Sequence, residues 1–145
     1  MRKVTVSAFL LFIVALVASC AVNTQEPVSS TILLDKVDRT ILGKDFSYPM
    51  DSPEVSSSIV VLQPGAETGW HFHEAPMYAY VLDGTLEVTY SDAGVEKTNT
   101  YTAGDAIMEG LDVPHKGRNV GSAPVSILVV NIGSVDLENT VLLGD

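Results

Sequence analysis

Hydrophobic and polar residues alternate over short stretches from Ile32 onward, and Gly, Pro, Asn and Asp separate the stretches. Alternation with a period of two is typical of half-buried β-strands, and we find no amphipathic helix of three turns. Many short strands at such spacing favour a sandwich or barrel. The pattern predicts strands at Ile32–Lys36, Glu54–Leu62, Gly69–Phe72, Met77–Leu82, Thr85–Tyr90, Glu96–Tyr101, Ala106–Met108, Lys116–Asn119 and Val125–Asn131.

Three short segments between these strands have the composition of turns. Asp83-Gly84 is a two-residue hairpin signal, because such turns favour residues that tolerate positive φ. The segment Ser91-Asp92-Ala93-Gly94 predicts a second hairpin, and Ala103-Gly104-Asp105 predicts a third turn.

The first twenty residues have the pattern of a signal peptide. Arg2 and Lys3 precede an apolar run over residues 4–18, which is too short for a membrane-spanning helix. The run ends in small residues before Cys20, which resembles the lipobox of bacterial lipoproteins. The resemblance implies that Cys20 carries a lipid and becomes the mature N-terminus; an ordinary secretory signal is the alternative.

The chain then divides into three parts: a signal peptide at 1–19, a lipid-anchored flexible tether at 20–31 and one folded domain at 32–145. The tether is small, polar and aperiodic. A lipid on Cys20 predicts an extracytoplasmic protein anchored to the membrane but not spanning it. Ala21 is not the aspartate associated with inner-membrane retention, so the resemblance favours the periplasmic face of a Gram-negative outer membrane.

Charge and cysteine content exclude several classes of function. The 145 residues include 18 acidic and 8 basic ones, a net charge of −10, and loss of Arg2 and Lys3 changes it to −12. Such a chain cannot neutralise a row of phosphates, so we expect no nucleic-acid partner. A single cysteine excludes an internal disulfide framework and a Cys-rich zinc site.

The three histidines are the main candidates for chemistry. His71 and His73 flank Phe72 in a predicted strand, so alternation sends both imidazoles to one face. Two imidazoles on one wall can reach the same cation at about 2.0–2.2 Å. His115 lies far along the chain, and only a folded barrel can bring it near the pair. Taken alone, the His-x-His pair is a weak signal.

The surrounding spacing resembles the two motifs of the cupin family. Gly65, five residues, His71-Phe72-His73, three residues, Met77, six residues and Gly84 match the first motif. Gly104, five residues, Gly110, then His115 and Asn119 match the second. The resemblance covers roughly Glu54 to Ile132.

The resemblance implies an all-β cupin jelly-roll barrel in which His71, His73 and His115 bind a divalent metal. Two departures stand out: Met77 replaces the usual metal-binding glutamate, and Gly110 and Asp112 replace the usual proline and glycine. Alternation predicts that Met77 points into the barrel with Ala79 and Val81, while Tyr78, Tyr80 and Leu82 face the other way.

Three interpretations of this site compete. The histidines bind Fe(II), Mn(II), Ni(II) or Zn(II), with open positions for water or substrate. Alternatively, Met77 also ligates, which favours copper because thioethers suit Cu(I). Finally, the site is degenerate and Met77 only fills the core, as methionine commonly does.

The other polar residues near the motifs receive weaker assignments. We expect Glu74 to point away from the site and Asn119 to fix the backbone near the barrel end. Glu109 is a candidate for lining the barrel mouth, where it would support the metal ligands from outside. Tyr78 and Tyr80 are expected to pack rather than contact substrate. The following acids are expected on the solvated surface: Asp35, Asp38, Glu96, Asp136 and Glu138.

No serine nucleophile elbow and no phosphate-binding glycine loop occurs in the sequence, so a metal is the remaining chemical centre. The leading hypothesis is a metal-dependent oxidoreductase of the dioxygenase type that acts on a small organic molecule outside the cytoplasm. The alternatives are a non-catalytic cupin that binds a small ligand or metal, and a lipoprotein whose barrel is only a scaffold. Single-domain cupins commonly pair, so we expect a homodimer.

Overall fold

The computed structural model describes residues 28–144, and no helix occurs among them. Nine strands form in chain order: β1 Pro53–Leu62, β2 His71–Phe72, β3 Met77–Asp83, β4 Thr85–Asp92, β5 Val95–Thr102, β6 Ala106–Met108, β7 His115–Asn119, β8 Val125–Ser134 and β9 Val141–Leu142. No helix able to cross a membrane is present within these described residues.

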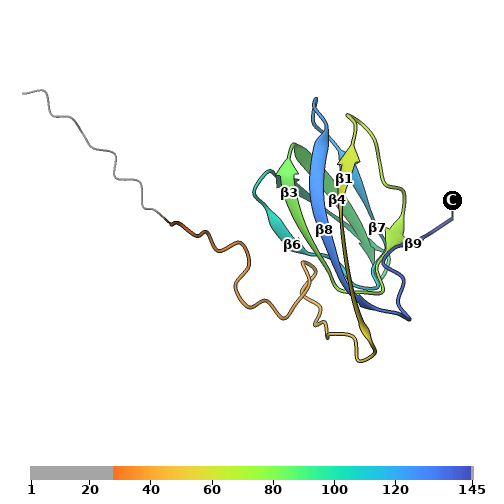
Figure 1. Cartoon of the computed structure of the whole chain (residues 1–145). Helices are drawn as coiled ribbons and strands as arrows, with labels where there is room; N and C mark the ends of the chain where they lie inside the picture. The colour runs from red at the N-terminus through yellow and green to blue at the C-terminus, as the bar shows by residue number, and fades with distance from the viewer. Residues whose placement is uncertain (1–27, 145) are drawn as a thin grey trace, which may run out of the picture. The chain divides into compact units, whose positions relative to one another are not determined.

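The strands make two antiparallel sheets that face each other (Figure 1). One sheet has the order β1-β8-β3-β6, and the other has the order β5-β4-β7-β2-β9. Neighbours within each sheet are mostly distant in the chain, as in a jelly roll. The predicted all-β jelly-roll architecture is confirmed.

Alternation along the strands builds the core between the sheets. In β3 the side chains of Met77, Ala79 and Val81 are buried, whereas Tyr78 and Tyr80 are half-buried on the opposite face. The inward-facing residues of both sheets form one cluster: Met77, Ala79, Val81, Leu86, Val88, Tyr90, Tyr101, Ile107, Val125 and Ile127. The predicted inward orientation of Met77 is therefore confirmed, and the two tyrosines lie on the outer face of the four-stranded sheet.

Eight of the predicted strands correspond to β1–β8, with bounds that differ by a few residues. The strand predicted at Ile32–Lys36 is wrong, because this segment has no paired neighbour and Ile32 is exposed. A short apolar run becomes a strand only where another strand satisfies its backbone groups. The short strand β9 was not predicted, and it pairs with β2 through Phe72 and Val141.

The predicted hairpin at Asp83-Gly84 is also wrong. Strands β3 and β4 belong to different sheets, so Gly84 turns the chain from one sheet to the other. Gly84 has φ +85°, and a Cβ there would lie 2.8 Å from the Val125 Cα atom. Glycine is required at this corner because of both its backbone angle and the close approach of β8.

The second predicted hairpin is confirmed between β4 and β5. Asp92 pairs with Val95, and the two intervening residues, Ala93 and Gly94, both have positive φ. These are the angles of a two-residue hairpin turn that follows the strand twist. The turn predicted at Ala103-Gly104-Asp105 connects β5 to β6, and Gly104 has φ +99°.

The predictions for the N-terminus fall mostly outside the described residues. The signal peptide at 1–19, Cys20 and all but the last residues of the tether at 20–31 belong to the part not described. Of the tether, only residues 28–31 are described, and all of them are exposed. These assignments stay predictions.

Candidate metal centre

Three histidines meet on the inner face of the five-stranded sheet. His71 lies on β2, His73 follows this strand, and His115 begins β7. Strands β2 and β7 are neighbours, and His71 is paired directly with His115. His73 is placed by a bridge to Leu111 on the loop before β7. The predicted convergence of the sequence-distant His115 on the His71–His73 pair is thus observed.

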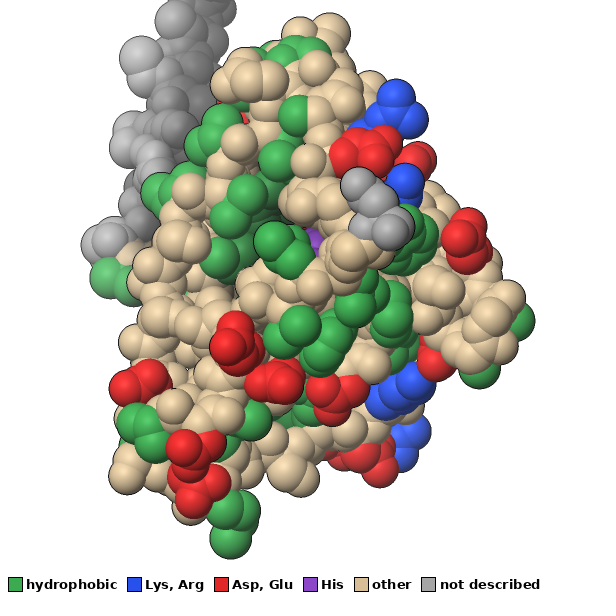
Figure 2. Space-filling model, turned by 90° about the vertical axis from the view of Figure 1, so that its right-hand side faces the viewer, with side chains coloured by type: hydrophobic (Ala, Val, Ile, Leu, Met, Phe, Trp, Pro, Cys, Tyr) green, Lys and Arg blue, Asp and Glu red, His purple; other side chains and the backbone are tan. Residues whose placement is uncertain are grey.

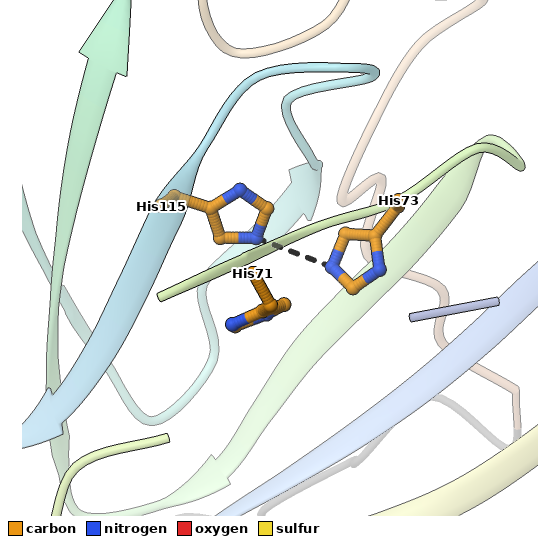
Figure 3. A group of neighbouring side chains, drawn as sticks. All are labelled: His71, His73 and His115. Atoms are coloured by element: carbon orange, nitrogen blue, oxygen red, sulfur yellow. Dashed lines mark hydrogen bonds between the residues drawn. The ribbon is translucent and has the colours of Figure 1, made fainter. Parts of the chain in front are cut away.

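The ring nitrogens of the three histidines lie around one point (Figure 3). Each ring offers a ligand nitrogen, and these atoms all lie within 4.8 Å of one another. The Nε2 atoms of His73 and His115 are 3.2 Å apart. Only 8%, 3% and 2% of His71, His73 and His115 are exposed, respectively.

Backbone carbonyls hold the other nitrogen of every ring. His71 Nδ1 lies 3.0 Å from Gly69 O, His73 Nδ1 lies 2.6 Å from Asn139 O, and His115 Nδ1 lies 2.7 Å from Val113 O. A carbonyl only accepts hydrogen bonds, so each Nδ1 is the donor. Each neutral imidazole therefore keeps its proton on Nδ1 and presents Nε2 as a free lone pair, the arrangement typical of metal-ligating histidines.

Burial keeps two of these rings uncharged. Desolvation lowers the pKa of His73 from 6.5 to about 4, although the hydrogen bond to Asn139 opposes the shift. Burial likewise lowers the pKa of His115 to about 4, against its hydrogen bond to Val113. Near neutral pH both imidazoles are thus in the form that binds metal.

The donor set fits a divalent cation. Ligands about 2.1 Å from a common ion lie roughly 3 Å from one another, close to the separation of the His73 and His115 Nε2 atoms. Two lone pairs facing each other at 3.2 Å repel unless a cation lies between them. The three histidines can therefore hold one metal ion and leave further coordination positions open.

The histidines open onto a cavity of about 410 Å³ between the two sheets. In the space-filling view a histidine side chain is visible at the bottom of an opening (Figure 2). The other wall is mostly aliphatic and includes Val60, Leu62, Ala79, Ile127 and Val129. Ligand sites of this volume take small organic molecules.

Met77 and Glu109 both line this cavity. Met77 stands on β3 where the resemblance expects a glutamate, and its side chain is buried. Glu109 follows β6, and its backbone N–H donates to Met77 O at 2.9 Å. Its Oε1 atom accepts a 2.8 Å hydrogen bond from Gly110 N, while burial raises its pKa. Glu109, a candidate from the sequence for lining the barrel mouth, thus lies in the cavity wall.

The remaining predicted positions have structural roles. Glu74 points away from the cavity and accepts a hydrogen bond from Glu138 N at 2.7 Å. Asn119 donates to Leu62 O and Ala123 O and accepts from Gly121 N, each at 2.8 Å. Asn119 thus fixes the backbone at the barrel end, as predicted. The five acids expected on the surface are all exposed: Asp35, Asp38, Glu96, Asp136 and Glu138.

The departures in the second motif change only local backbone. Asp112 occupies the usual glycine position and has φ +54°, a left-handed conformation that Asp tolerates better than most residues. Its N–H donates to His73 O at 3.0 Å. The loop before β7 therefore still supports the metal site.

Two functional residues were missed by sequence reasoning. Asn131 on β8 lines the cavity, and Asn139 supplies the carbonyl for His73. Inward alternation along Val125–Asn131 indicates the orientation of Asn131, since the buried Val125 and Ile127 precede it at even spacing. No local signal identifies Asn139, because its role depends on where the loop after β8 lies.

Comparisons with known proteins agree with this architecture. The family profile described as the cupin domain matches residues 58–131. No curated protein of similar sequence was found. Similar solved structures include oxalate decarboxylase from Lactobacillus farciminis, as a formate complex, with 24% identity and a TM-score of 0.55 over 61% of this chain and 26% of that one.

Oxalate decarboxylase from Bacillus subtilis, with Mn(II) centres, has 26% identity and a TM-score of 0.55 over 61% of this chain and 24% of that one. The same enzyme at pH 4.6 gives 26% identity and a TM-score of 0.55, over 61% and 23% of the two chains. The chain thus spans about a quarter of the length of these enzymes. The shared part has the same fold, and the Bacillus enzyme contains Mn(II) centres.

Proposed function

This chain belongs to the cupin domain family, and from that premise we propose that it is a metal-dependent oxidoreductase of the dioxygenase type. Its substrate is a small organic molecule bound in the cavity beside His71, His73 and His115. The lipid-anchored N-terminus predicted at Cys20 puts this activity at the periplasmic face of the outer membrane. The cupin fold alone does not establish this function, because function depends on the residues of the site.

One observation carries the proposal: three buried imidazoles present free Nε2 lone pairs to one point because three carbonyls hold their Nδ1 protons. When bound, the metal supplies Lewis-acid activation and open positions for substrate and dioxygen. Because the three imidazoles are neutral, the full positive charge of the metal would be available to a substrate oxygen. Fe(II), Ni(II) and Zn(II) suit imidazole ligands, Mn(II) is the hardest of the candidate ions, and copper becomes the better candidate if Met77 ligates.

The protein contributes orientation and exclusion of water. The cavity walls are largely aliphatic, so a bound molecule loses most of its hydration before it reaches the histidines. In a dioxygenase reaction both atoms of dioxygen enter the substrate, and the substrate itself supplies the electrons. No further reductant is required.

A non-catalytic cupin that binds a small ligand is the second candidate. It is favoured because, among the described residues that line the cavity, Glu109 is the one ionisable side chain besides the histidines. A site with few acid–base groups suits binding as well as chemistry.

Elemental analysis of tag-free protein tests the metal site first. We expect close to one equivalent of a divalent transition metal, and its absence after reconstitution with each candidate metal would refute the site. Oxygen-electrode measurements with diketones, phenols and thiols then separate the two candidates. Substrate-dependent oxygen uptake that is lost in His73→Ala supports the oxidoreductase, whereas ligand binding without uptake supports the second candidate.

A further inference from the structure

The outer faces of the two sheets carry different kinds of side chain. On the five-stranded sheet, Glu87 of β4 is paired with Arg118 of β7. Thr89 of β4 is paired with Lys116 of β7 and with Thr98 of β5. All of these side chains line a polar groove on the outside of this sheet. The outer face of the five-stranded sheet is therefore one that is suited to water.

The outer face of the four-stranded sheet is apolar instead. Directly paired residues of antiparallel strands project to the same face. The register of β1, β8 and β3 therefore builds one continuous apolar face, which is turned to the viewer in Figure 1. The residues of this apolar face are Val55, Ser57, Ile59 and Val61 of β1, Ser126, Leu128, Val130 and Ile132 of β8, and Tyr78 and Tyr80 of β3. None of them is charged; the carboxylate of Asp83 lies at the border, where β3 ends, and accepts a hydrogen bond from Gly84 N.

The apolar face is open on its β1 side. Val55, Ile59 and Val61 are 69%, 61% and 50% exposed, whereas the residues of β8 and β3 on this face are half-buried. Aliphatic side chains this exposed gain free energy when another surface removes them from water. A contiguous apolar patch on the outside of a sheet marks an interaction site.

Strand β1 also lacks the usual protection of a sheet edge. One side of β1 is paired with β8 in a register that runs without a bulge, and its other side has no partner strand among residues 28–144. Long edge strands usually carry lysine, proline or a bulge that prevents association. In β1 the proline and the one charged residue, Pro53 and Glu54, both stand at its start. The rest of β1 is therefore suited to an interface.

The size of the apolar face suits a dimer. Strands β1, β8 and β3 have 10, 10 and 7 residues, which at their usual rise and spacing cover about 430 Å² of flat sheet. Side chains that project from the sheet add to this flat area. Two such faces together therefore reach the roughly 1,000 Å² that a specific interface needs.

Charge selects a second copy of this chain as the partner. The net charge of −10 makes two copies repel each other, and the repulsion is smallest where the facing surfaces carry no charge. Contact through the polar groove would bring the carboxylates of Glu67, Glu87 and Glu96 towards those of the other copy. The apolar face is flat and uncharged, so it can meet itself across a two-fold axis.

We propose that two copies of the chain form a two-fold dimer through the apolar face, sheet against sheet, with their β8 strands at the centre. This inference goes beyond the proposed function and does not depend on the metal. It also gives the dimer a structural effect on the cavity, because Ser58 and Val60 of β1 line the cavity on the inner face of the same sheet. The second copy would thus support one wall of the cavity from outside.

Site-specific photo-cross-linking of the full chain in intact cells tests the dimer. The photo-reactive residue p-benzoyl-phenylalanine replaces Ile59 on the apolar face or, as the matched control, Thr98 on the outer face of the other sheet. Both positions lie within strands and are exposed, so both tolerate a larger side chain. We expect irradiation to give a product of twice the monomer mass from position 59 and none from position 98. Mass spectrometry of this product should find peptides of this chain alone.

A charge on the apolar face should prevent the association. Val61→Glu, combined with the photo-reactive residue at position 59, should lower the yield of dimer at least about tenfold, because two unpaired carboxylates would be buried in the interface. Thr98→Glu adds the same charge to the other sheet and should leave the yield unchanged. Circular dichroism should show that both variants are folded, since both positions are exposed in the single chain.

Three results would overturn the proposal. Equal yields from positions 59 and 98 would mean that the products come from random collisions. A full yield of dimer in Val61→Glu would place the contact on another surface. A product at position 59 that contains only lipid or another protein, or the absence of any product there, would show that no second copy covers this face.

Discussion

Each imidazole of the metal centre owes its orientation to a backbone carbonyl. The acceptors are Gly69 O, Asn139 O and Val113 O, which come from three different loops. Removing one ring takes away a ligand but leaves the other two held in place. Two imidazoles bind a divalent ion far more weakly than three, so the loss should be nearly complete in a single variant.

We therefore expect His71→Ala or His73→Ala to remove most of the bound metal, and the double variant to add little. Metal content by mass spectrometry of tag-free protein measures this. Glu96→Ala, which changes an exposed acid, serves as the control. Full metal content in both single variants would exclude the histidine site.

Acid should destabilise the metal-free protein through the same rings. His73 and His115 have pKa values of about 4 when folded and 6.5 otherwise, so the unfolded chain binds more protons between these limits. Stability must then fall as pH decreases from 6.5 towards 4. Urea unfolding in EDTA at several pH values measures the slope, which should flatten in His73→Ala. An unchanged slope in that variant would contradict the prediction.

Restoring the family's glutamate at position 77 tests whether this side chain faces the metal. Met77→Glu adds a carboxylate to the cavity, and hard ions such as Mn(II) prefer oxygen ligands. Without metal the buried carboxylate is poorly solvated and destabilises the fold. Added Mn(II) should thus raise the melting temperature of Met77→Glu more than that of wild type.

Paired melting curves with EDTA and with Mn(II) decide this point. Met77→Gln is the control, because it changes shape similarly without adding charge. An equal shift in Met77→Glu and wild type would mean that Met77 does not face the metal.

Among the elements, the corner between β3 and β4 depends on a single residue, Gly84, where the chain passes from one sheet to the other. Gly84 has φ +85°, and Val125 of β8 lies against it. Gly94 in the β4–β5 turn has φ +81° but has open space around it. The two glycines share a backbone angle and differ in their neighbours.

Gly84→Ala should therefore destabilise the protein more than Gly94→Ala. The second change costs about 1 kcal/mol for the left-handed backbone alone. The first adds a steric overlap with the Val125 backbone, for a total of about 3 kcal/mol or more. Denaturant unfolding of both variants gives the difference, and equal losses would show that the corner relaxes freely.

At the scale of the whole molecule, the negative charge of the chain bears on how it meets a membrane. The mature chain would have a charge of −12, which disfavours adsorption to anionic lipid surfaces. A lipid on Cys20 would therefore be the main source of membrane attachment.

Cys20→Ser should abolish labelling by a clickable fatty acid and move the protein out of the membrane fraction or stall its maturation. Cell fractionation with immunoblotting measures both effects. A conservative change outside the motif, Val22→Ala, should leave the labelling intact. Recovery of the wild-type chain entirely in the soluble fraction would refute the anchor.

The sequence by itself determined the features that depend on local alternation and fixed spacing. These include eight strands, the inward orientation of Met77, and the shared face of His71 and His73, because a strand sends every second side chain to one side. The family spacing also predicted that His115 joins the pair. These features needed no knowledge of which strands are neighbours.

Only the tertiary structure decided the features that join distant segments. Gly84 lies at a sheet corner rather than in a hairpin because β3 and β4 belong to different sheets, and Ile32–Lys36 forms no strand because no neighbour pairs with it. The carbonyl of Asn139 and the cavity-lining Asn131 acquire their roles through strand register and loop position. Hydrogen-bond partners far apart in the chain are set by the packing of whole sheets, which no local pattern encodes.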